Sequence, residues 1–478
     1  MEFFERCPVL PQTAGAPSPE VPVQWVLRSP IAPPSFIAPP HLEPIAMHYS
    51  KVRHGETPAR EATALSKVSR IVVWALLTIC INLSPSLAQT RILHGSDQVI
   101  LTPAQQEVVD KLVRAPGTLN VRVLTRTDTP QTEPPENRYA TLILPLSEGR
   151  EISLVRTRPR LRSERGVTWS GVAEETGERA ILMMWNDGHL SGYFTYEGRV
   201  FSISHVGGYI HTIAEIELPP DHAPNAAAAL YESVTPRPAP PEPKVAPFPT
   251  SERLALEAKT ITIDLMLLYT KNAADHYLGE PADLLALAIA EANDAFKRSG
   301  LGNISLKIVH TQLIDYDETD GAQFDHLYRM VDGVGTFRDV RRLRDEKRAD
   351  IVGLIIHSPS GCGLSTRVGA DSEEAFFVAH HSCSAITFTI AHEVGHIIGA
   401  RHDRSVDGNN KPFAYAHGYV NGTKWRDIMS SKESCGGCPR IPFWSNPRIM
   451  YNGEPTGTDA TDNARVILEQ AERVSGFR

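Results

Sequence analysis

The sequence predicts an α/β domain in the C-terminal half of the chain, preceded by a β-rich module. In residues 257–478, buried-type apolar runs alternate with amphipathic helical patterns, which is typical of a layered α/β sheet. Residues 89–234 instead carry short β-branched and apolar runs broken by glycine and Asn-Asp-Gly turns, which indicates strands joined by hairpins. Seven prolines fall within residues 235–250 and mark the boundary between the two regions.

Composition excludes several classes of protein. The chain has 478 residues, a formal net charge of -8 and 22% charged residues, which is ordinary for a globular protein and unlike a nucleic-acid binder held by phosphate contacts. No apolar run reaches the ~20 residues of a membrane helix. Six cysteines are too few to replace a hydrophobic core. We therefore expect no nucleic-acid partner and no membrane anchorage once the N-terminal segment is removed.

The first 88 residues are not expected to belong to the fold. Residues 1–46 contain eleven prolines and read as a disordered Pro-rich segment or a start codon assigned too early. Residues 47–88 have a basic flank, an apolar run at 71–83 and the small-residue sequence Ser86-Leu87-Ala88, which together are typical of a secretory signal peptide. A buried core helix is the alternative. The signal predicts a secreted, extracellular protein.

Residues 89–234 are expected to form the β-rich module. Asn186-Asp187-Gly188 between two apolar runs predicts a tight hairpin. His189, His205 and His211 lie in this region, and isolated histidines of strands and loops are more often surface residues than metal ligands. Residues 235–256 are expected to be a stiff, extended, Pro-rich linker that does not pack and is open to proteolysis.

The C-terminal domain, residues 257–478, is predicted element by element. Buried strands are expected at 260–269, 304–314, 350–357 and 375–379, because each is a run of β-branched or apolar residues. Residues 281–299 show helical spacing, with Pro281 near the start and Gly300 at the end. Residues 336–347 predict a charged surface helix.

One segment carries the chemistry. His392 and His396 are four residues apart, so on a helix both imidazoles leave the same face and can reach one zinc ion. Glu393 lies beside the first of them, where it can hold a water molecule. Gly399 permits a left-handed turn that ends the helix and returns His402 to the same ion. Three imidazoles leave a fourth position open, which indicates a catalytic rather than a structural zinc.

The helix that carries these histidines is expected to be buried rather than on the surface. Its apolar flank brings the polar residues into the interior, where imidazoles need partners, and a metal ion supplies one. The flanking residues are Ile386, Phe388, Ile390, Val394, Ile397 and Ile398.

After signal removal, four cysteines remain, and an oxidising compartment favours two disulfides. Three pairings are possible, of which we prefer Cys362 with Cys383 and Cys435 with Cys438. The Cys-x-x-Cys pair is also compatible with half of a zinc site or with a redox-active dithiol, but neither a second pair nor a thioredoxin-like context accompanies it.

The motif resembles that of the metzincin metalloproteases, in which His-Glu-x-x-His-x-x-Gly-x-x-His is followed by a methionine turn. Here the methionine would be Met429, within Asp427-Ile-Met-Ser. Asp403 directly follows the third histidine, and in this the motif resembles the reprolysin-like branch. Residues 434–447 and 451–457 resemble the bacterial peptidyl-Asp metalloendopeptidase family. The resemblance covers about residues 257–478.

The resemblance implies a metzincin-type domain, with a twisted mixed sheet plus an active-site helix, preceded by a propeptide. It implies a secreted zymogen of a zinc endopeptidase that binds one catalytic Zn2+, with Glu393 as general base and cleavage before aspartate. Whether Ca2+ is also bound stays open. Polypeptides would be its substrates, and its own propeptide would be an inhibitor. Residues 89–256 contain no cysteine, so a propeptide thiolate cannot be the inhibiting group.

Supporting roles follow from the same resemblance. Asp403 would orient a zinc ligand or form a structural ion pair, and Met429 would be an apolar floor beneath the imidazoles. Arg440, preferred over Lys432, would bind the substrate aspartate because guanidinium binds carboxylate bidentately. Substrate would lie along an edge strand near residues 363–369.

Two alternatives differ in class. A catalytically silent secreted metal-binding or interaction protein would use the same fold, although such a protein would not need Glu393. An extracellular thiol–disulfide protein would be centred on Cys435 and Cys438.

Overall fold

The computed structural model describes residues 89–95, 99–127, 140–147, 149–157, 161–162, 166–221, 241–277 and 281–478. The Pro-rich start and the signal peptide expected at residues 1–88 lie outside the described residues. Residues 235–240 of the expected linker lie outside them as well. The described residues all lie within one compact unit. Within the described part, no helix is both long and apolar enough to span a bilayer.

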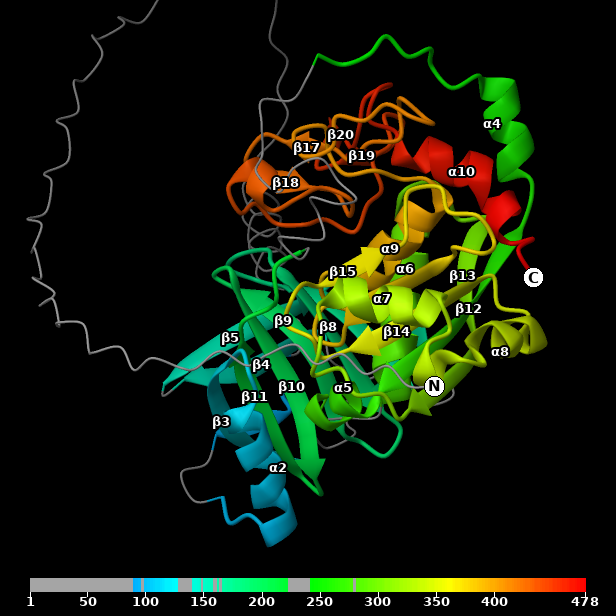
Figure 1. Cartoon of the computed structure of the whole chain (residues 1–478). Helices are drawn as coiled ribbons and strands as arrows, with labels where there is room; N and C mark the ends of the chain where they lie inside the picture. The colour runs from blue at the N-terminus through cyan, green and yellow to red at the C-terminus, as the bar shows by residue number, and fades with distance from the viewer. Residues whose placement is uncertain are drawn as a thin grey trace, which may run out of the picture. The chain divides into compact units, whose positions relative to one another are not determined.

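An eleven-stranded, mostly antiparallel sheet forms the N-terminal part of that unit (Figure 1). Along its main path the strands run in the order β1-β4-β5-β7-β8-β9-β10-β11-β3-β2, with β6 paired to β7. The strands are β1 (Gln89–Arg91), β2 (Leu93–Gly95), β3 (Thr118–Arg126), β4 (Thr141–Ser147), β5 (Arg150–Arg156), β6 (Leu161–Arg162), β7 (Gly166–Ala173), β8 (Arg179–Trp185), β9 (Leu190–Tyr196), β10 (Arg199–Gly207) and β11 (Ile210–Ile216). The short apolar runs and turns of residues 89–234 predicted that this region is rich in strands.

Two details of this sheet differ from expectation. The helix α2 (Pro103–Arg114) was not predicted. The Thr102 hydroxyl accepts a bond from the Gln105 amide, and the Gln105 side chain accepts a bond from the Thr102 amide. This capping box fixes the start of the helix. The expectation that the three histidines are surface residues was wrong for His211, which is fully buried. Its Nε2 accepts a bond from the Leu190 amide at 3.0 Å. The predicted hairpin joins β8 to β9 as an antiparallel pair.

The C-terminal part is built on a five-stranded sheet of order β13-β12-β14-β16-β15. All neighbours are parallel except β15, which runs antiparallel to β16 and forms an edge. The strands are β12 (Ile261–Thr270), β13 (Ile304–Ile314), β14 (Ile351–Ile356), β15 (Gly363–Ser365) and β16 (Phe376–His380). The predicted runs became strands because both faces of this sheet are covered by helices.

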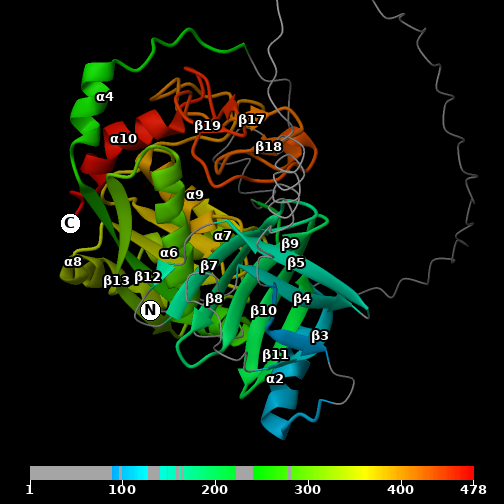
Figure 2. The same ribbon diagram turned by 180° about the vertical axis from the view of Figure 1, so that it is seen from behind.

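Helices cover the two faces of this sheet. The helical elements are α4 (Thr250–Glu257), α5 (Lys271–His276), α6 (Pro281–Arg298), α7 (Gln323–Val331), η1 (Gly335–Phe337), α8 (Val340–Lys347), α9 (Thr389–Ile398), η2 (Glu433–Cys435) and α10 (Asn463–Val474). The expected charged helix at 336–347 is split, because only residues from Val340 onward continue as α8. Short pairs β17 (Val420–Asn421) with β18 (Trp425–Arg426) and β19 (Met450–Tyr451) with β20 (Glu454–Pro455) complete the C-terminal loops (Figure 2).

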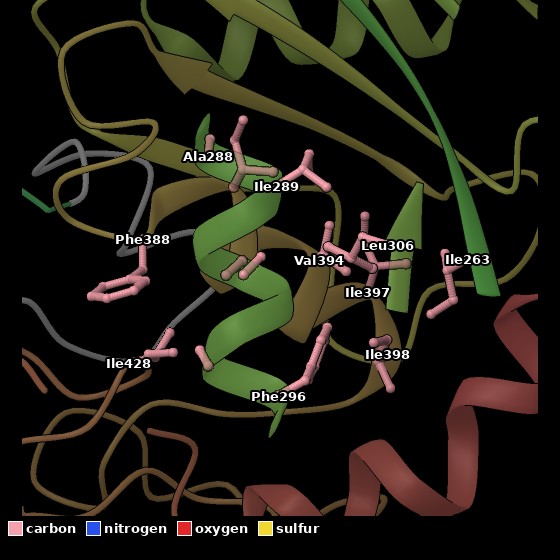
Figure 3. Close-up of a cluster of buried hydrophobic side chains, with 14 of the residues drawn as sticks. Ile263, Ala288, Ile289, Phe296, Leu306, Phe388, Val394, Ile397, Ile398 and Ile428 are labelled. Carbon is pink, nitrogen blue, oxygen red and sulfur yellow. The ribbon is translucent and has the colours of Figure 1, made fainter. Parts of the chain in front are cut away.

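Side chains alternate between two cores. Ile263, Leu265 and Leu267 of β12 join the core that contains α6, α9 and α10, whereas Met266 and Leu268 join the core beside α7 and α8. Figure 3 shows part of the first core, with Val394, Ile397 and Ile398 of α9 among the clustered side chains. The apolar flank predicted for the histidine-bearing helix is thus what buries it.

The N-terminal sheet contributes to the same core. Ile181 of β8 and Tyr193 of β9 are buried in the cluster that holds α6 and α9. The expectation that residues 235–256 do not pack was wrong for their C-terminal part, because Phe248 is buried in this cluster and lies against the guanidinium of Arg465. The segment from residue 250 is helix α4, whose Leu256 also packs on the core.

Candidate active site

Helix α9 carries the histidine motif at the centre of the site. Every residue of the helix is buried. It ends where expected: Gly399 has φ +140, a conformation that favours glycine, and the amides of Gly399 and Ala400 both donate to the Gly395 carbonyl. The chain then turns back and places His402 against the helix that carries the other two histidines.

The Nε2 atoms of His392, His396 and His402 lie 3.1 Å from one another in all three pairs. Three imidazole nitrogens that converge in a buried site cannot all satisfy one another, because a neutral ring has only one N–H. Nδ1 of His392 donates to the Ile428 carbonyl and Nδ1 of His396 to the Ala400 carbonyl, each at 2.9 Å. Those bonds leave the Nε2 lone pairs of both rings facing inward, which fits a tetrahedral zinc ion.

Glu393 lies beside this triad and is fully buried. Burial raises the pKa of its carboxyl well above the ordinary value, contact with Ser365 and the charge of Arg440 oppose that rise, and the charge of Asp221 adds to it. A Cβ atom added at Gly363 would lie 2.4 Å from Glu393 Oε1, so the carboxylate packs directly against the edge strand β15. The Glu393 carboxylate therefore contacts the edge strand, and Glu393 directly follows His392 in sequence.

The segment after the third histidine is tied to the methionine segment. Asp403 accepts bonds from the Ser431 amide and the Ser434 hydroxyl, both at 2.9 Å. Asp403 also accepts bonds from the amide and the hydroxyl of Ser405, so its bonds lie within the turn, which favours a turn-supporting role. Met429 is fully buried, and its sulfur would lie 3.2 Å from a Cβ at Gly395, between the first two histidines.

Sequence reasoning missed two groups that support the site. The ring of His417 is buried and its Nδ1 donates to the carbonyl of His402 at 2.9 Å. Asp427 is fully buried, accepts the Ser430 hydroxyl at 2.5 Å and the Ser445 amide at 3.0 Å, and burial raises its pKa to about 6. Neither residue belongs to the His-Glu-x-x-His motif. The only sequence signal for Asp427 is that it lies two residues before Met429.

The side chain of Arg440 is largely withdrawn from solvent, with 9% of it exposed. Its guanidinium donates to the Thr387 carbonyl at 2.7 Å and to the Ser430 carbonyl at 3.3 Å, and it forms an ion pair with Asp221 at 3.0 Å. Lys432, the other candidate, is exposed. The predicted arginine therefore lies next to the methionine segment, in contact with a carboxylate of the chain itself.

The two preferred cysteine pairs are both disulfides in the structure, Cys362 with Cys383 and Cys435 with Cys438. The first joins the residue before β15 to the loop before α9, so it links the edge strand to the histidine-bearing helix. With both sulfurs of the Cys-x-x-Cys pair bonded to each other, the pair does not form half of a zinc site.

A second group of histidines lies at the carboxyl ends of β14 and β16. Nitrogens of His357, His380 and His381 fall within 4.8 Å of one another, and the ring of His276 stacks on His357. Burial lowers the pKa of His357 to about 4 and of His380 to about 3. His357 Nδ1 and His381 Nε2 are 2.8 Å apart, a hydrogen bond between two neutral rings. The sequence signal was available, since parallel strands end at the same sheet edge.

Comparison with known proteins identifies the family. Residues 259–445 match the metallo-peptidase family M12 model. A peptidyl-Asp metalloendopeptidase of Xanthomonas campestris pv. campestris is 31% identical over 316 residues, which cover 66% of this chain and 73% of that protein. One from Stenotrophomonas maltophilia is 27% identical over 399 residues, covering 78% and 90%. The solved structure of metalloproteinase-II from Bacteroides fragilis aligns with a TM-score of 0.34 and 14% identity, over 63% of this chain and 86% of that one.

The family match and the two relatives agree with the buried triad and the carboxylate beside it. The chain belongs to the peptidyl-Asp metalloendopeptidases of metallo-peptidase family M12 and is a zinc metalloendopeptidase.

Proposed function

We propose that the chain is a secreted zymogen of a zinc endopeptidase that cleaves peptide bonds before aspartate. His392, His396 and His402 hold the zinc ion, and Glu393 is the general base. The observation that carries the proposal is the convergence of three buried Nε2 atoms at 3.1 Å, with the Glu393 carboxylate beside them. A metzincin-type fold is supported by the glycine turn at Gly399 and by the methionine next to α9.

The chemistry divides between the metal and the side chains. A zinc ion held by the three imidazoles would supply a Lewis acid that polarises a carbonyl and lowers the pKa of water toward ~7. Glu393 takes a proton from the attacking water on a carboxylate oxygen and then gives it to the nitrogen of the leaving amine. The buried setting that raises its pKa suits a group that must hold a proton between these two steps. His392 and His396 keep their orientation through their Nδ1 bonds to backbone carbonyls.

Substrate binding is assigned to the edge strand and to Arg440. β15 is an edge of its sheet, so an extended peptide can add to it through backbone hydrogen bonds. Arg440 is held by two backbone carbonyls with its Nη2 directed at a carboxylate, which suits recognition of an aspartate side chain.

The zymogen part of the proposal rests on contacts between the N-terminal sheet and the catalytic region. Arg179 of β8 donates to the Ile386 carbonyl at 3.0 Å, lies 3.9 Å from the ring centre of Phe388, and pairs with the buried Glu291. His392, Glu393 and the other triad histidines are at most 4% exposed in this chain. A sheet docked in this way suits a propeptide. Secretion rests on the signal-like residues 47–88.

Mapping of cleavage sites on a peptide library tests the proposal, using enzyme processed near the Pro-rich segment. We expect new N-termini to begin with aspartate, and activity to vanish with a chelator. Glu393→Gln is expected to retain zinc and lose activity. Cleavage without acidic preference would remove the substrate assignment, and an active Glu393→Gln enzyme would remove the general base.

Arg440→Lys and Arg440→Ala test the pocket in the same library. Lysine keeps the charge but not the two-pronged donor, so we expect a partial loss of cleavage before aspartate, whereas alanine should abolish the preference. An unchanged preference in Arg440→Ala would refute this role.

A further inference from the structure

The last described residues of the N-terminal region run into the substrate-binding edge. After β11 the chain continues as Glu217-Leu218-Pro219-Pro220-Asp221. The Pro220 carbonyl accepts a bond of 2.7 Å from the amide of Cys362, the residue that precedes β15. The next residue along that strand, Gly363, is the one against which the Glu393 carboxylate packs. The segment therefore bonds to Cys362, the residue directly before the glycine that packs against the proposed general base.

The side chain of Asp221 lies against two cations whose side chains are largely buried. Its Oδ2 lies 3.0 Å from Arg440 Nη2 and 3.8 Å from Arg426 Nη1. Each arginine is 9% exposed, so the ion pairs form in a largely desolvated place. The family resemblance pointed to Arg440 but not to Arg426.

The position of Arg426 is built into the structure. Its Nε donates to the Cys438 carbonyl at 3.3 Å and its Nη1 to the Ser430 carbonyl at 3.2 Å, and the same Ser430 carbonyl accepts from Arg440. Burial, and next to it the charge of Arg440, lower the pKa of Arg426 to about 10, although the charges of Asp221, Glu433 and Asp427 act in the opposite direction. Two guanidiniums on one carbonyl repel each other, so the pocket has a strong preference for an anion.

The segment is bound as an occupant and not as a substrate poised for cleavage. For the bond before Asp221 to be cut, the Pro220 carbonyl would have to be polarised at the metal. In the structure that carbonyl is engaged by the Cys362 amide instead. Asp221 is thus paired with Arg440 while the carbonyl before it is bonded to Cys362, directly before the strand.

We propose that Pro220-Asp221 is a built-in pseudosubstrate: Asp221 fills the aspartate pocket formed by Arg440 and Arg426, and thereby keeps the uncleaved chain inactive. The inference rests on the proposed preference for aspartate, and it adds Arg426 as a second specificity-determining residue. Because the N-terminal module has no cysteine, a thiolate cannot inhibit the enzyme; the Asp221 carboxylate, bound in the substrate pocket, takes that role instead.

The test compares the intact chain with the processed enzyme, using a quenched fluorescent peptide that contains one aspartate. Intact wild type, Asp221→Asn, Asp221→Glu and Asp110→Asn are assayed before and after limited proteolysis near the Pro-rich segment, with mass spectrometry to verify that the intact samples are uncut. Asp110 lies on α2, where its carboxylate accepts a bond from Gln106 of the same helix, so its variant is a matched loss of one carboxylate.

Intact Asp221→Asn is expected to be roughly 30-fold or more as active as intact wild type, since breaking a buried charge pair weakens binding by at least that factor. Asp221→Glu should lie between the two, and Asp110→Asn should stay as inactive as wild type. A short peptide with the sequence of residues 218–221 should inhibit the processed enzyme competitively, and its asparagine version should inhibit far less.

Arg426→Gln tests the second cation in the processed enzyme. We expect a higher KM for the aspartate peptide, with little change for the matched asparagine peptide. An intact Asp221→Asn chain as inactive as wild type, when the processed enzyme does prefer aspartate, would overturn the pseudosubstrate. If the processed enzyme itself shows no preference for aspartate, the proposed function is wrong. The processed sample therefore tells failure of the proposed function apart from failure of the pseudosubstrate.

Discussion

Replacing Gly395 by alanine is expected to destabilise the protein through one crowded contact. An added Cβ would lie 2.6 Å from both Cη2 and Cζ3 of Trp444 and 3.2 Å from the sulfur of Met429. The Trp444 ring cannot move aside easily, because it is fully buried and stacked on Phe296 with ring centres 5.6 Å apart. The Trp444 amide is also fixed by a 2.8 Å bond to the Ser299 hydroxyl.

Two opposing terms set the magnitude. Glycine to alanine within a helix gains about 1 kcal/mol from backbone propensity. Overpacking a filled core costs about 1–3 kcal/mol, and contacts well below van der Waals distance put this site near the upper end. We therefore expect a net loss of roughly 1–2 kcal/mol. Because Gly395 lies between His392 and His396, zinc should also dissociate faster from the variant.

Denaturant unfolding of four chains measures the effect: wild type, Gly395→Ala, Trp444→Leu and the double variant. If the clash is with the Trp444 ring, the double variant should lose less stability than the sum of the single variants, by about 1 kcal/mol or more. Gly302→Ala is the matched control, since its nearest atom would be 3.9 Å away, at Lys297 Cγ. A Gly395→Ala protein as stable as wild type, or strictly additive effects, would refute the reasoning.

Three further predictions concern catalysis, pH and the disulfide. Gly363→Ala should lower kcat by about 10²-fold while zinc stays bound, because its Cβ would displace the Glu393 carboxylate; a normal kcat would contradict that contact. Burial lowers the pKa of His211 to about 4, so its stabilising effect is complete above the unfolded pKa of ~6.5 and falls by about 1.4 kcal/mol per pH unit as the pH drops toward 4. His211→Gln should remove that part of the acid dependence in urea unfolding at pH 5 and 7, and an identical slope would argue against a neutral buried ring. Replacing Cys362 and Cys383 by serine should cost about 3 kcal/mol, since the bridge closes a loop of sequence separation 21; a Tm equal to that of wild type would be inconsistent with this estimate.

The site could be predicted where its geometry is local in sequence. The four-residue spacing of His392 and His396 fixes both rings on one helix face, and Gly399 supplies the conformation that returns the chain. The strands β12 and β13 were predictable for a similar reason, because their runs of apolar residues are long enough to identify a buried strand.

What could not be predicted depends on contacts between distant parts of the chain. The pair of Asp221 and Arg440 joins residues 219 positions apart, and no pattern around Asp221 distinguishes it from a loop carboxylate. The burial of Phe248 was hidden by the prolines around it, whose composition favours an exposed linker. Helix α2 was missed because its capping box lies in a region whose overall composition favours strands.

The central claim is that three imidazoles hold one zinc ion, and metal content per chain tests it most directly. Elemental analysis of the dialysed processed enzyme is expected to find one zinc in wild type and in Glu393→Gln, and almost none in His402→Ala. One retained zinc in His402→Ala, or none in active wild type, would contradict the account.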